Sequence, residues 1–300
     1  MALPIDCELG ESCYIQNYVD HDPGPQATDF TCGPQTNDTH KGTDIGLPDL
    51  AAMRRGVSVL AAASGVVTGT RDGVPDISIR DPGAPDLQGR ECGNGVVLRH
   101  PDGWETQYCH MKQGSIRVES GQKVTTGTLL GQVGLSGQTE FPHVHLSVRK
   151  NGQVIDPFAA SDTSSCGNDT HQLWQTKIGY VPGGLLRVGF ADSVPRFADI
   201  RDRDISQRSL PADAPALVLW GNFYGGRKGD EVLITIAGPD GFRFERRIAL
   251  EKNLAIFFRA SGRKRPSGGW TPGNYQGQID LIRDGQSLSR GSTSLTVTSR

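Results

Sequence analysis

Glycine and proline interrupt this chain so often that the sequence disfavours long helices. The 300 residues include 39 glycines and 18 prolines, and these fall between short apolar runs. Both residue types favour turns and weaken helix interiors, so the pattern predicts many short strands. Between residues 40 and 158 we find no convincing pair of helix start and stop signals. We therefore predict an all-β protein built from antiparallel sheets.

Strand signals in the first half follow a loop-rich segment and are separated by glycine turns. They cover Val57–Ala63, Val66–Thr70, Gly95–Arg99, Glu105–His110, Leu129–Val133 and His143–Arg149. The last run ends at Lys150-Asn151-Gly152-Gln153, a sequence typical of a two-residue hairpin turn.

A small, polar stretch near residue 165 separates this region from a second set of strand signals. These signals cover Leu185–Phe190, Ala216–Trp220, Glu231–Ala237, Phe242–Leu250, Leu254–Arg259, Tyr275–Arg283 and Ser294–Thr298. About seven short strands predict a β-sandwich of the immunoglobulin-like kind. Its expected core includes Trp220, Phe244, Phe257 and Trp270. The predicted organisation is a loop-rich segment over 1–39, a β domain over 40–160, a linker over 161–174 and the β-sandwich over 175–300.

Charge is divided unevenly along the chain. Residues 1–170 carry a net charge of −9 and residues 171–300 a net charge of +7. Either the two domains attract each other, which is the simpler interpretation, or the basic half faces an anionic surface. The basic half shows no nucleic-acid-binding motif, so we expect no nucleic-acid partner. The apolar runs are shorter than the ~18 residues of a membrane helix, and we expect no membrane span.

All six cysteines lie in the acidic half, and none forms a Cys-x-x-Cys pair. An even number in one domain favours disulfides and an oxidising compartment over free buried thiols in a cytosolic protein. The expected pairs are Cys7 with Cys13, Cys92 with Cys109 and, by elimination, Cys32 with Cys166. The first residues lack the charged and apolar regions of a secretory signal, so we expect the natural chain to have carried a leader that is absent here.

Three short motifs contain the residues suited to chemistry. They are His40-Lys41-Gly42-Thr43-Asp44, Tyr108-Cys109-His110 and His143-Val144-His145. Two imidazoles and one carboxylate are a common ligand set for catalytic zinc, which keeps a further position for water. On a strand, His143 and His145 would point from the same face, roughly 6–7 Å apart. No His-Glu-x-x-His motif occurs, which excludes a zincin. We assign no function to His21, His100 or His171.

In their order and spacing, these motifs resemble the lysostaphin/LytM-type zinc endopeptidases. The resemblance runs from His40 to Asp156-Pro157 and includes Gly93-Asn94-Gly95-Val96-Val97-Leu98-Arg99-His100, Gly121-Gln122-Lys123-Val124, Gly134-Leu135-Ser136-Gly137 and Pro142-His143-Val144-His145. It implies a groove-bearing β fold. The departures are Val144 and Leu146 in place of leucine and phenylalanine, Cys109 within the Tyr-x-His motif, and extra sequence around Leu47–Arg55.

The resemblance also implies an activity and a site. It places the Zn²⁺ ligands on His40, Asp44 and His145, and the two catalytic histidines on His110 and His143. The implied reaction is hydrolysis of peptide bonds in bacterial peptidoglycan by a metal-activated water. The alternative is a non-hydrolytic envelope protein of the same fold that activates other cell-wall hydrolases. We expect a periplasmic or secreted monomer whose accessory domain has an unidentified partner.

Three points stay open at the level of sequence. One is which bond is cleaved, a D-Ala–diaminopimelate cross-link or a Gly–Gly bridge. Another is which of His110 and His143 acts as general base. The third is whether residues 1–39 cover the groove and inhibit the enzyme, with Asn37, Asp38 or His21 as a fourth zinc ligand.

Overall fold

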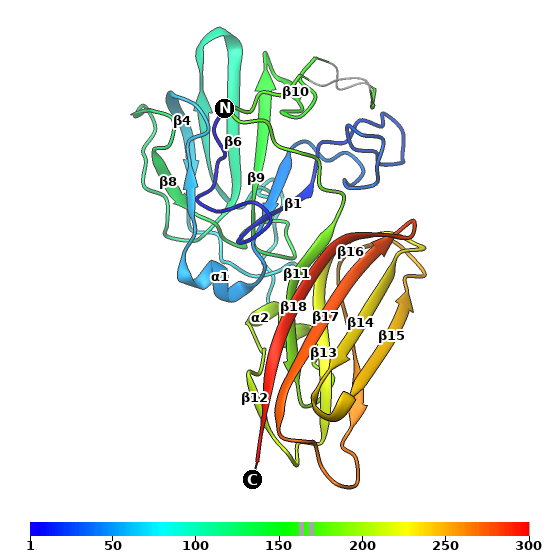
Figure 1. Ribbon diagram of the computed structural model, residues 1–300. Helices are drawn as coiled ribbons and strands as arrows, with labels where there is room; N and C mark the ends of the chain where they lie inside the picture. The colour runs from blue at the N-terminus through cyan, green and yellow to red at the C-terminus, as the bar shows by residue number, and fades with distance from the viewer. Residues whose placement is uncertain (162–164, 168–170, 300) are drawn as a thin grey trace. The chain divides into compact units, whose positions relative to one another are not determined.

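The computed structural model describes residues 1–161, 165–167 and 171–299 (Figure 1). The chain divides into two compact units, Met1–Tyr180 and Val181–Arg300. Part of the predicted linker, residues 162–164 and 168–170, lies outside the described residues. Within the described ranges, the helices are too short and too polar to cross a membrane.

The first unit contains an eight-stranded antiparallel sheet with the order β1-β2-β9-β6-β5-β4-β7, in which β10 also pairs with β9. Its strands are β1 (Tyr14–Asn17), β2 (Thr43–Gly46), β4 (Gly65–Arg71), β5 (Asn94–Arg99), β6 (Trp104–Met111), β7 (Lys123–Val124), β9 (His143–Lys150) and β10 (Gln153–Ile155). A second, two-stranded sheet pairs β3 (Ser58–Leu60) with β8 (Leu129–Gln132). The antiparallel architecture expected from the sequence is confirmed.

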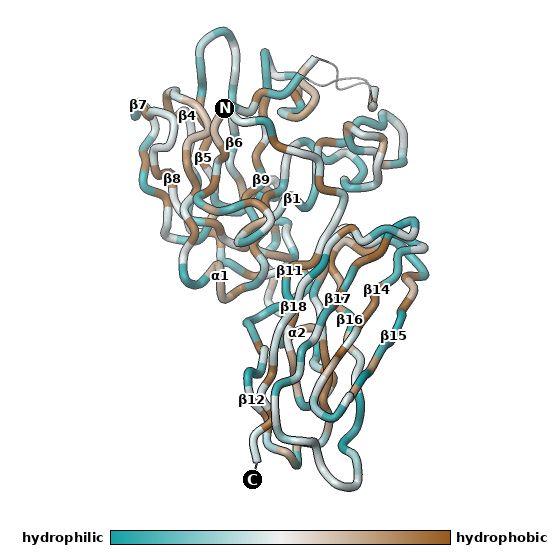
Figure 2. Tube along the Cα trace, viewed as in Figure 1, coloured by the Kyte–Doolittle hydropathy of each residue, from teal (hydrophilic) through white to brown (hydrophobic). Residues whose placement is uncertain are grey.

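The core of this unit gathers the apolar side chains of the sheet strands, and the apolar stretch of β5 stands out in Figure 2. A cluster of aromatic side chains from both ends of this chain segment joins the core. The ring of Tyr18 lies 4.9 Å from that of Phe158, and Phe158 lies 5.4 Å from both Phe30 and Trp174. The N-terminal segment and residues near 174 therefore pack on the same core as the sheet.

One expectation for this unit is wrong, because a short helix, α1 (Leu50–Arg55), lies between residues 40 and 158. It forms in the extra sequence noted around Leu47–Arg55. The Asp49 carboxylate accepts a hydrogen bond from the Ala52 backbone N–H, and Gly56 ends the helix at a φ of 90°. Both signals are present in the sequence, but a six-residue helix carries too little apolar periodicity to be recognised.

All three predicted disulfides are confirmed: Cys7–Cys13, Cys32–Cys166 and Cys92–Cys109. The Cys92–Cys109 bond joins strand β6 to the segment just before β5, as the predicted hairpin requires.

The second unit is a β-sandwich. Strands β11 (Gly184–Ala191), β13 (Ala216–Gly226) and β16 (Leu254–Lys264) form one sheet. The other contains β12 (Ser209–Pro211), β18 (Gln286–Thr298), β17 (Gly273–Arg283), β14 (Glu231–Ala237) and β15 (Arg243–Ala249), in that order. Side chains of both sheets share one core.

The predicted core residues of this unit have different roles. Phe257 and Trp270 are buried in this core, whereas Phe244 is only partly buried. Trp220 packs with Ile200 of helix α2 (Phe197–Asp202) in a separate cluster. The apolar pattern of the sequence identified buried residues but could not tell which face of a strand each one occupies.

Candidate metal centre

Neighbouring strands bring the histidine and aspartate motifs together. In the pairing of β2 with β9, Asp44 lies opposite His145 and Gly46 lies opposite His143. Because alternate residues of a strand point to the same face, the side chains of His143 and His145 share a face with Asp44. His40 precedes β2 and contacts the same carboxylate.

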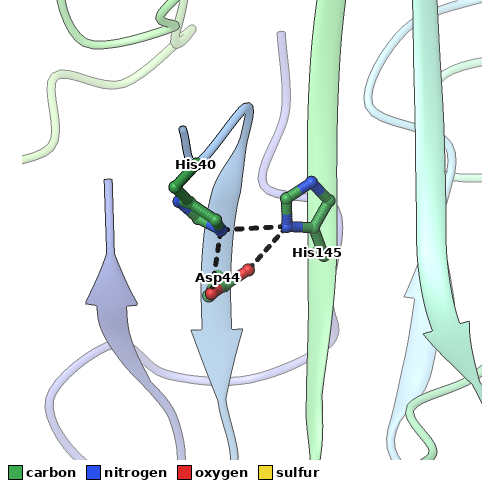
Figure 3. Close-up of side chains that lie close together, drawn as sticks. All are labelled: His40, Asp44 and His145. Carbon is green, nitrogen blue, oxygen red and sulfur yellow. Dashed lines mark hydrogen bonds and ion pairs between the residues drawn. The ribbon is translucent and has the colours of Figure 1, made fainter. Parts of the chain in front are cut away.

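His40, Asp44 and His145 form a compact donor set (Figure 3). His40 Nε2 lies 3.1 Å from Asp44 Oδ2, His145 Nδ1 lies 2.8 Å from Asp44 Oδ1, and the two ring nitrogens are 3.2 Å apart. The three donor atoms all lie within 4.8 Å of one another. Two imidazoles and one carboxylate at this spacing can hold a single metal ion.

The opposite edge of each imidazole is held by protein. His40 Nδ1 lies 2.7 Å from the Tyr18 carbonyl oxygen, and His145 Nε2 lies 3.0 Å from Ser147 Oγ. A carbonyl only accepts hydrogen bonds, so a neutral His40 carries its proton on Nδ1 and directs the Nε2 lone pair at Asp44. Gly42 is required beside His145, since a Cβ atom there would approach His145 Nε2 to 2.5 Å.

The two other predicted site histidines lie next to this donor set. His143 Nε2 is 3.4 Å from Asp44 Oδ1, and its Nδ1 is 2.9 Å from the Phe141 carbonyl oxygen. His110 Nδ1 is 2.8 Å from the Ser136 carbonyl oxygen, and its ring centroid is 4.6 Å from that of His143. The structure thus brings all five predicted site residues into one cluster.

His110 reaches the cluster through an irregularity in the sheet. It adopts a φ of 60°, which is uncommon for a residue other than glycine. Between the Asn94–Met111 and Val96–Tyr108 pairs, one residue of β5 opposes two of β6, which is a β-bulge. Bulges of this kind redirect side chains near functional sites. The His110 backbone N–H donates to the Cys92 carbonyl at 2.8 Å, which holds this conformation.

Burial and neighbouring charges shift the pKa values of the cluster's residues in different directions. Burial would raise the pKa of Asp44, but the neighbouring His40 and His143 hold this pKa well below its ordinary value. Burial also opposes protonation of His40, yet Asp44 raises the pKa of His40 to about 9. Burial lowers the pKa of His145, and burial together with His143 and His145 lowers the pKa of His110 well below its ordinary value.

A metal ligand must be a neutral imidazole or an ionised carboxylate. The direction of these shifts leaves Asp44 ionised and His145 neutral at pH 7, as ligands require. A metal would have to displace the proton that His40 shares with Asp44.

The residues considered as a fourth ligand lie elsewhere or face solvent. The His21 ring contacts Asp156, with Nε2 2.9 Å from Oδ2, and the Ser165 carbonyl. Asn37 and Asp38 are exposed. A residue that the sequence did not single out, Asn17, does reach the cluster: its Nδ2 lies 2.9 Å from Asp44 Oδ2.

A β-sheet that presents two imidazoles and a carboxylate at one point, with two further histidines beside them, is a metallopeptidase-type arrangement. Comparison with known proteins agrees. Residues 38–157 match the model of Peptidase family M23. This part of the chain is therefore similar to an M23 domain, as its motifs predicted.

Among similar proteins, DD-carboxypeptidase/endopeptidase Mpg of Neisseria meningitidis is 31% identical over 124 residues, which cover 41% of this chain and 23% of the relative. Peptidoglycan DD-endopeptidase ShyA of Vibrio cholerae is 30% identical over 122 residues, which also cover 41% of this chain and 23% of the relative. The catalytic domain of the M23 protein EnpA from Enterococcus faecalis is 25% identical, with a TM-score of 0.35 over 52% of this chain and 96% of that domain. The chain spans about a quarter of the length of both curated relatives.

Proposed function

We propose that this protein is a zinc-dependent endopeptidase that hydrolyses peptide bonds in bacterial peptidoglycan. The observation that carries the proposal is the convergence of His40, Asp44 and His145 on one point, with His110 and His143 alongside. The donor chemistry fits Zn²⁺, since imidazole nitrogen and carboxylate oxygen are its usual ligands in catalytic sites. The Tyr18 carbonyl oxygen lies 2.7 Å from His40 Nδ1, and histidine ligands commonly donate their other ring N–H to a group of this kind.

His40, Asp44 and His145 would hold the ion. Zn²⁺ bound there would polarise the carbonyl of the scissile peptide bond and lower the pKa of its bound water to about 7. The protein residues would then manage the protons. His110 and His143 each direct Nδ1 at a backbone carbonyl, so in their neutral forms the proton lies on Nδ1 and Nε2 can accept another.

In the proposed reaction, one of these two rings takes a proton from the attacking water at Nε2 and later delivers it to the leaving amine. The new bond joins the water oxygen to the carbonyl carbon, and the carbon–nitrogen bond breaks. The second ring, when protonated, donates a hydrogen bond to the oxyanion. The lowered pKa of His110 means that this ring enters the reaction neutral and able to accept a proton.

The relatives favour one substrate class. Both curated relatives described above have names that include an endopeptidase activity, and the name of one specifies peptidoglycan DD-endopeptidase. We propose the DD cross-link of peptidoglycan as the bond cleaved here, with Gly–Gly bridges as the competing substrate. Three disulfides fit a protein that works in the periplasm or outside the cell.

The experiment is digestion of purified sacculi that contain either DD cross-links or Gly–Gly bridges, with the released fragments identified by mass. We expect the zinc-loaded protein to release DD-cleaved fragments, a chelator to abolish release, and added Zn²⁺ to restore it. His145→Ala, which removes one proposed ligand, is the inactive control. If the zinc-loaded protein releases no fragment from either wall, the hydrolase proposal is wrong and the non-hydrolytic alternative takes its place.

A further inference from the structure

The N-terminal segment contacts the proposed metal centre although it lies outside the residues that match the family model. Asn17 is the last residue of β1, and its Nδ2 donates to Asp44 Oδ2 at 2.9 Å. The next residue, Tyr18, provides the carbonyl oxygen beside His40 Nδ1. Two consecutive residues therefore contact two of the three proposed ligands.

A register shift in the sheet is what brings Asn17 to this position. Ile15 pairs with Ile45, but the next pair is Asn17 with Asp44, so Gln16 is an extra residue in β1. With regular pairing, Gln16 would lie opposite Asp44 and Asn17 would point to the other face. The bulge instead aligns the asparagine with the aspartate across the two strands.

The contact is buried and has a defined direction. Asn17 is 8% exposed and Asp44 is 4% exposed, so little water competes for the hydrogen bond. The amide group donates to Oδ2, which also lies 3.1 Å from His40 Nε2, while Oδ1 is the oxygen nearest to His145 and His143. An amide donor holds the carboxylate without adding a charge that would oppose a cation.

We propose that Asn17 is a positioning residue, which fixes the rotation of the Asp44 carboxylate and so keeps it directed at the metal. This inference rests on the proposed function. It also assigns a role to the N-terminal segment, as a support of the metal centre. Contacts behind a ligand of this kind are typically worth about 10- to 100-fold in metal affinity.

The test compares Zn²⁺ affinity in the full chain and in the variants Asn17→Leu and Asn17→Ala, by competition with a chromogenic chelator. We expect both variants to bind Zn²⁺ about 10- to 100-fold more weakly than the natural sequence. The visible absorption of the Co²⁺-substituted proteins provides a second readout, because it reports ligand geometry; we expect it to change in both variants. Two variants of different size ensure that poor folding of one does not decide the result.

Gln35→Leu is the matched control. Gln35 Nε2 donates to the Ile15 carbonyl at 2.9 Å, so the substitution weakens the support of the same strand without touching Asp44. We expect it to lower thermal stability and leave Zn²⁺ affinity unchanged. If the Asn17 variants bind Zn²⁺ as tightly as the natural sequence, the positioning role is wrong while the proposed function stands. If the natural sequence itself binds no Zn²⁺, both fail together.

Discussion

At the scale of single residues, His110 and the proposed ligands make separable contributions. His110 contacts the Ser136 carbonyl and packs against His143, whereas Asp44 is held by His40, His145 and Asn17. A change at His110 therefore leaves the donor set in place. The same separation does not hold for His143, which lies 3.4 Å from Asp44.

We expect His110→Ala to bind one Zn²⁺ per chain while its turnover falls by about 10²- to 10⁴-fold, because a proton-transfer group is lost. Metal content by elemental analysis and cleavage of a cross-linked peptide measure the two effects. His100→Ala is the control, since the His100 ring contacts Ser64 and Thr106. Near-normal turnover of the His110 variant would remove His110 from the mechanism.

The site residues differ in how far the sequence could reveal them. Alternation along a strand predicts that His143 and His145 share a face, and the structure has both rings in contact with Asp44. Asn17 was missed because its position depends on a bulge, and no local pattern in Tyr14–Asn17 marks one. The positive φ of His110 was missed for the same reason.

At the scale of elements, the β5–β6 hairpin and its disulfide hold His110. Cys109 precedes this residue, and the Cys92 carbonyl accepts its backbone N–H. We expect the double substitution Cys92→Ala/Cys109→Ala to lower the free energy of unfolding by about 3 kcal/mol, because a closed loop is released. We also expect turnover to fall more than Zn²⁺ affinity, because the disulfide adjoins His110 directly, whereas the three proposed ligands lie outside β5 and β6.

The Cys7–Cys13 bond is the matched comparison, because it lies before β1 and joins cysteines only six positions apart in the sequence. Its double alanine variant should lose less stability and keep its turnover per folded molecule. Urea denaturation and steady-state kinetics give both quantities. Equal turnover in the two double variants would show that the Cys92–Cys109 bond does not position His110.

A second contact between distant segments joins the N-terminal loop to the segment after β10. His21 is buried against Asp156 and the Ser165 carbonyl. Burial lowers the pKa of His21, but the hydrogen bonds to Asp156 and Ser165, with the charges of Asp156 and Asp29, raise this pKa above 6.5 overall. A pKa raised on folding stabilises the protein fully below 6.5, and this contribution is lost as the pH rises through the folded-state value.

We therefore expect the metal-free natural sequence to lose part of its stability advantage over His21→Gln as the pH rises above 6.5. At lower pH the variant should be less stable by about 1.5–3 kcal/mol, the typical contribution of a hydrogen bond to a charged group. Urea denaturation across a pH series measures the free energy of unfolding of both proteins. The other histidines titrate in both, so their contribution cancels in the difference. A difference that is constant with pH would mean that His21 does not change its protonation on folding.

Elements with strong local turn chemistry were the ones that the sequence predicted well. Lys150-Asn151-Gly152-Gln153 forms the expected hairpin, and Asn151 and Gly152 both have positive φ values, as this turn requires. Helix α2 and strand β12 were missed, because their six and three residues are stabilised by packing and by pairing with β18. Short elements of this kind depend on tertiary contacts more than on local propensity.

At the scale of the whole molecule, each unit has a core of its own. Apolar residues as far as Tyr180 belong to the first core, and those from Leu185 onward belong to the cores of the β-sandwich. The residues that match the family model, 38–157, are therefore a part of the first unit. They lack β1, with Asn17, and the aromatic residues Tyr18, Trp174 and Tyr180.

Residues 1–180 contain these residues of the first unit, whereas a fragment of residues 38–157 lacks them. We expect residues 1–180 to fold alone, to bind Zn²⁺ as the full chain does and to cleave a soluble cross-linked peptide at a similar rate, because the fragment keeps its core and both supports of the ligands. Residues 38–157 should unfold at lower temperature and bind Zn²⁺ at least tenfold more weakly, since the contacts of Asn17 and Tyr18 are lost. Thermal denaturation and chelator competition on both fragments measure these effects. Equal Zn²⁺ affinity would show that the family-matched residues form a complete metal centre without the N-terminal segment.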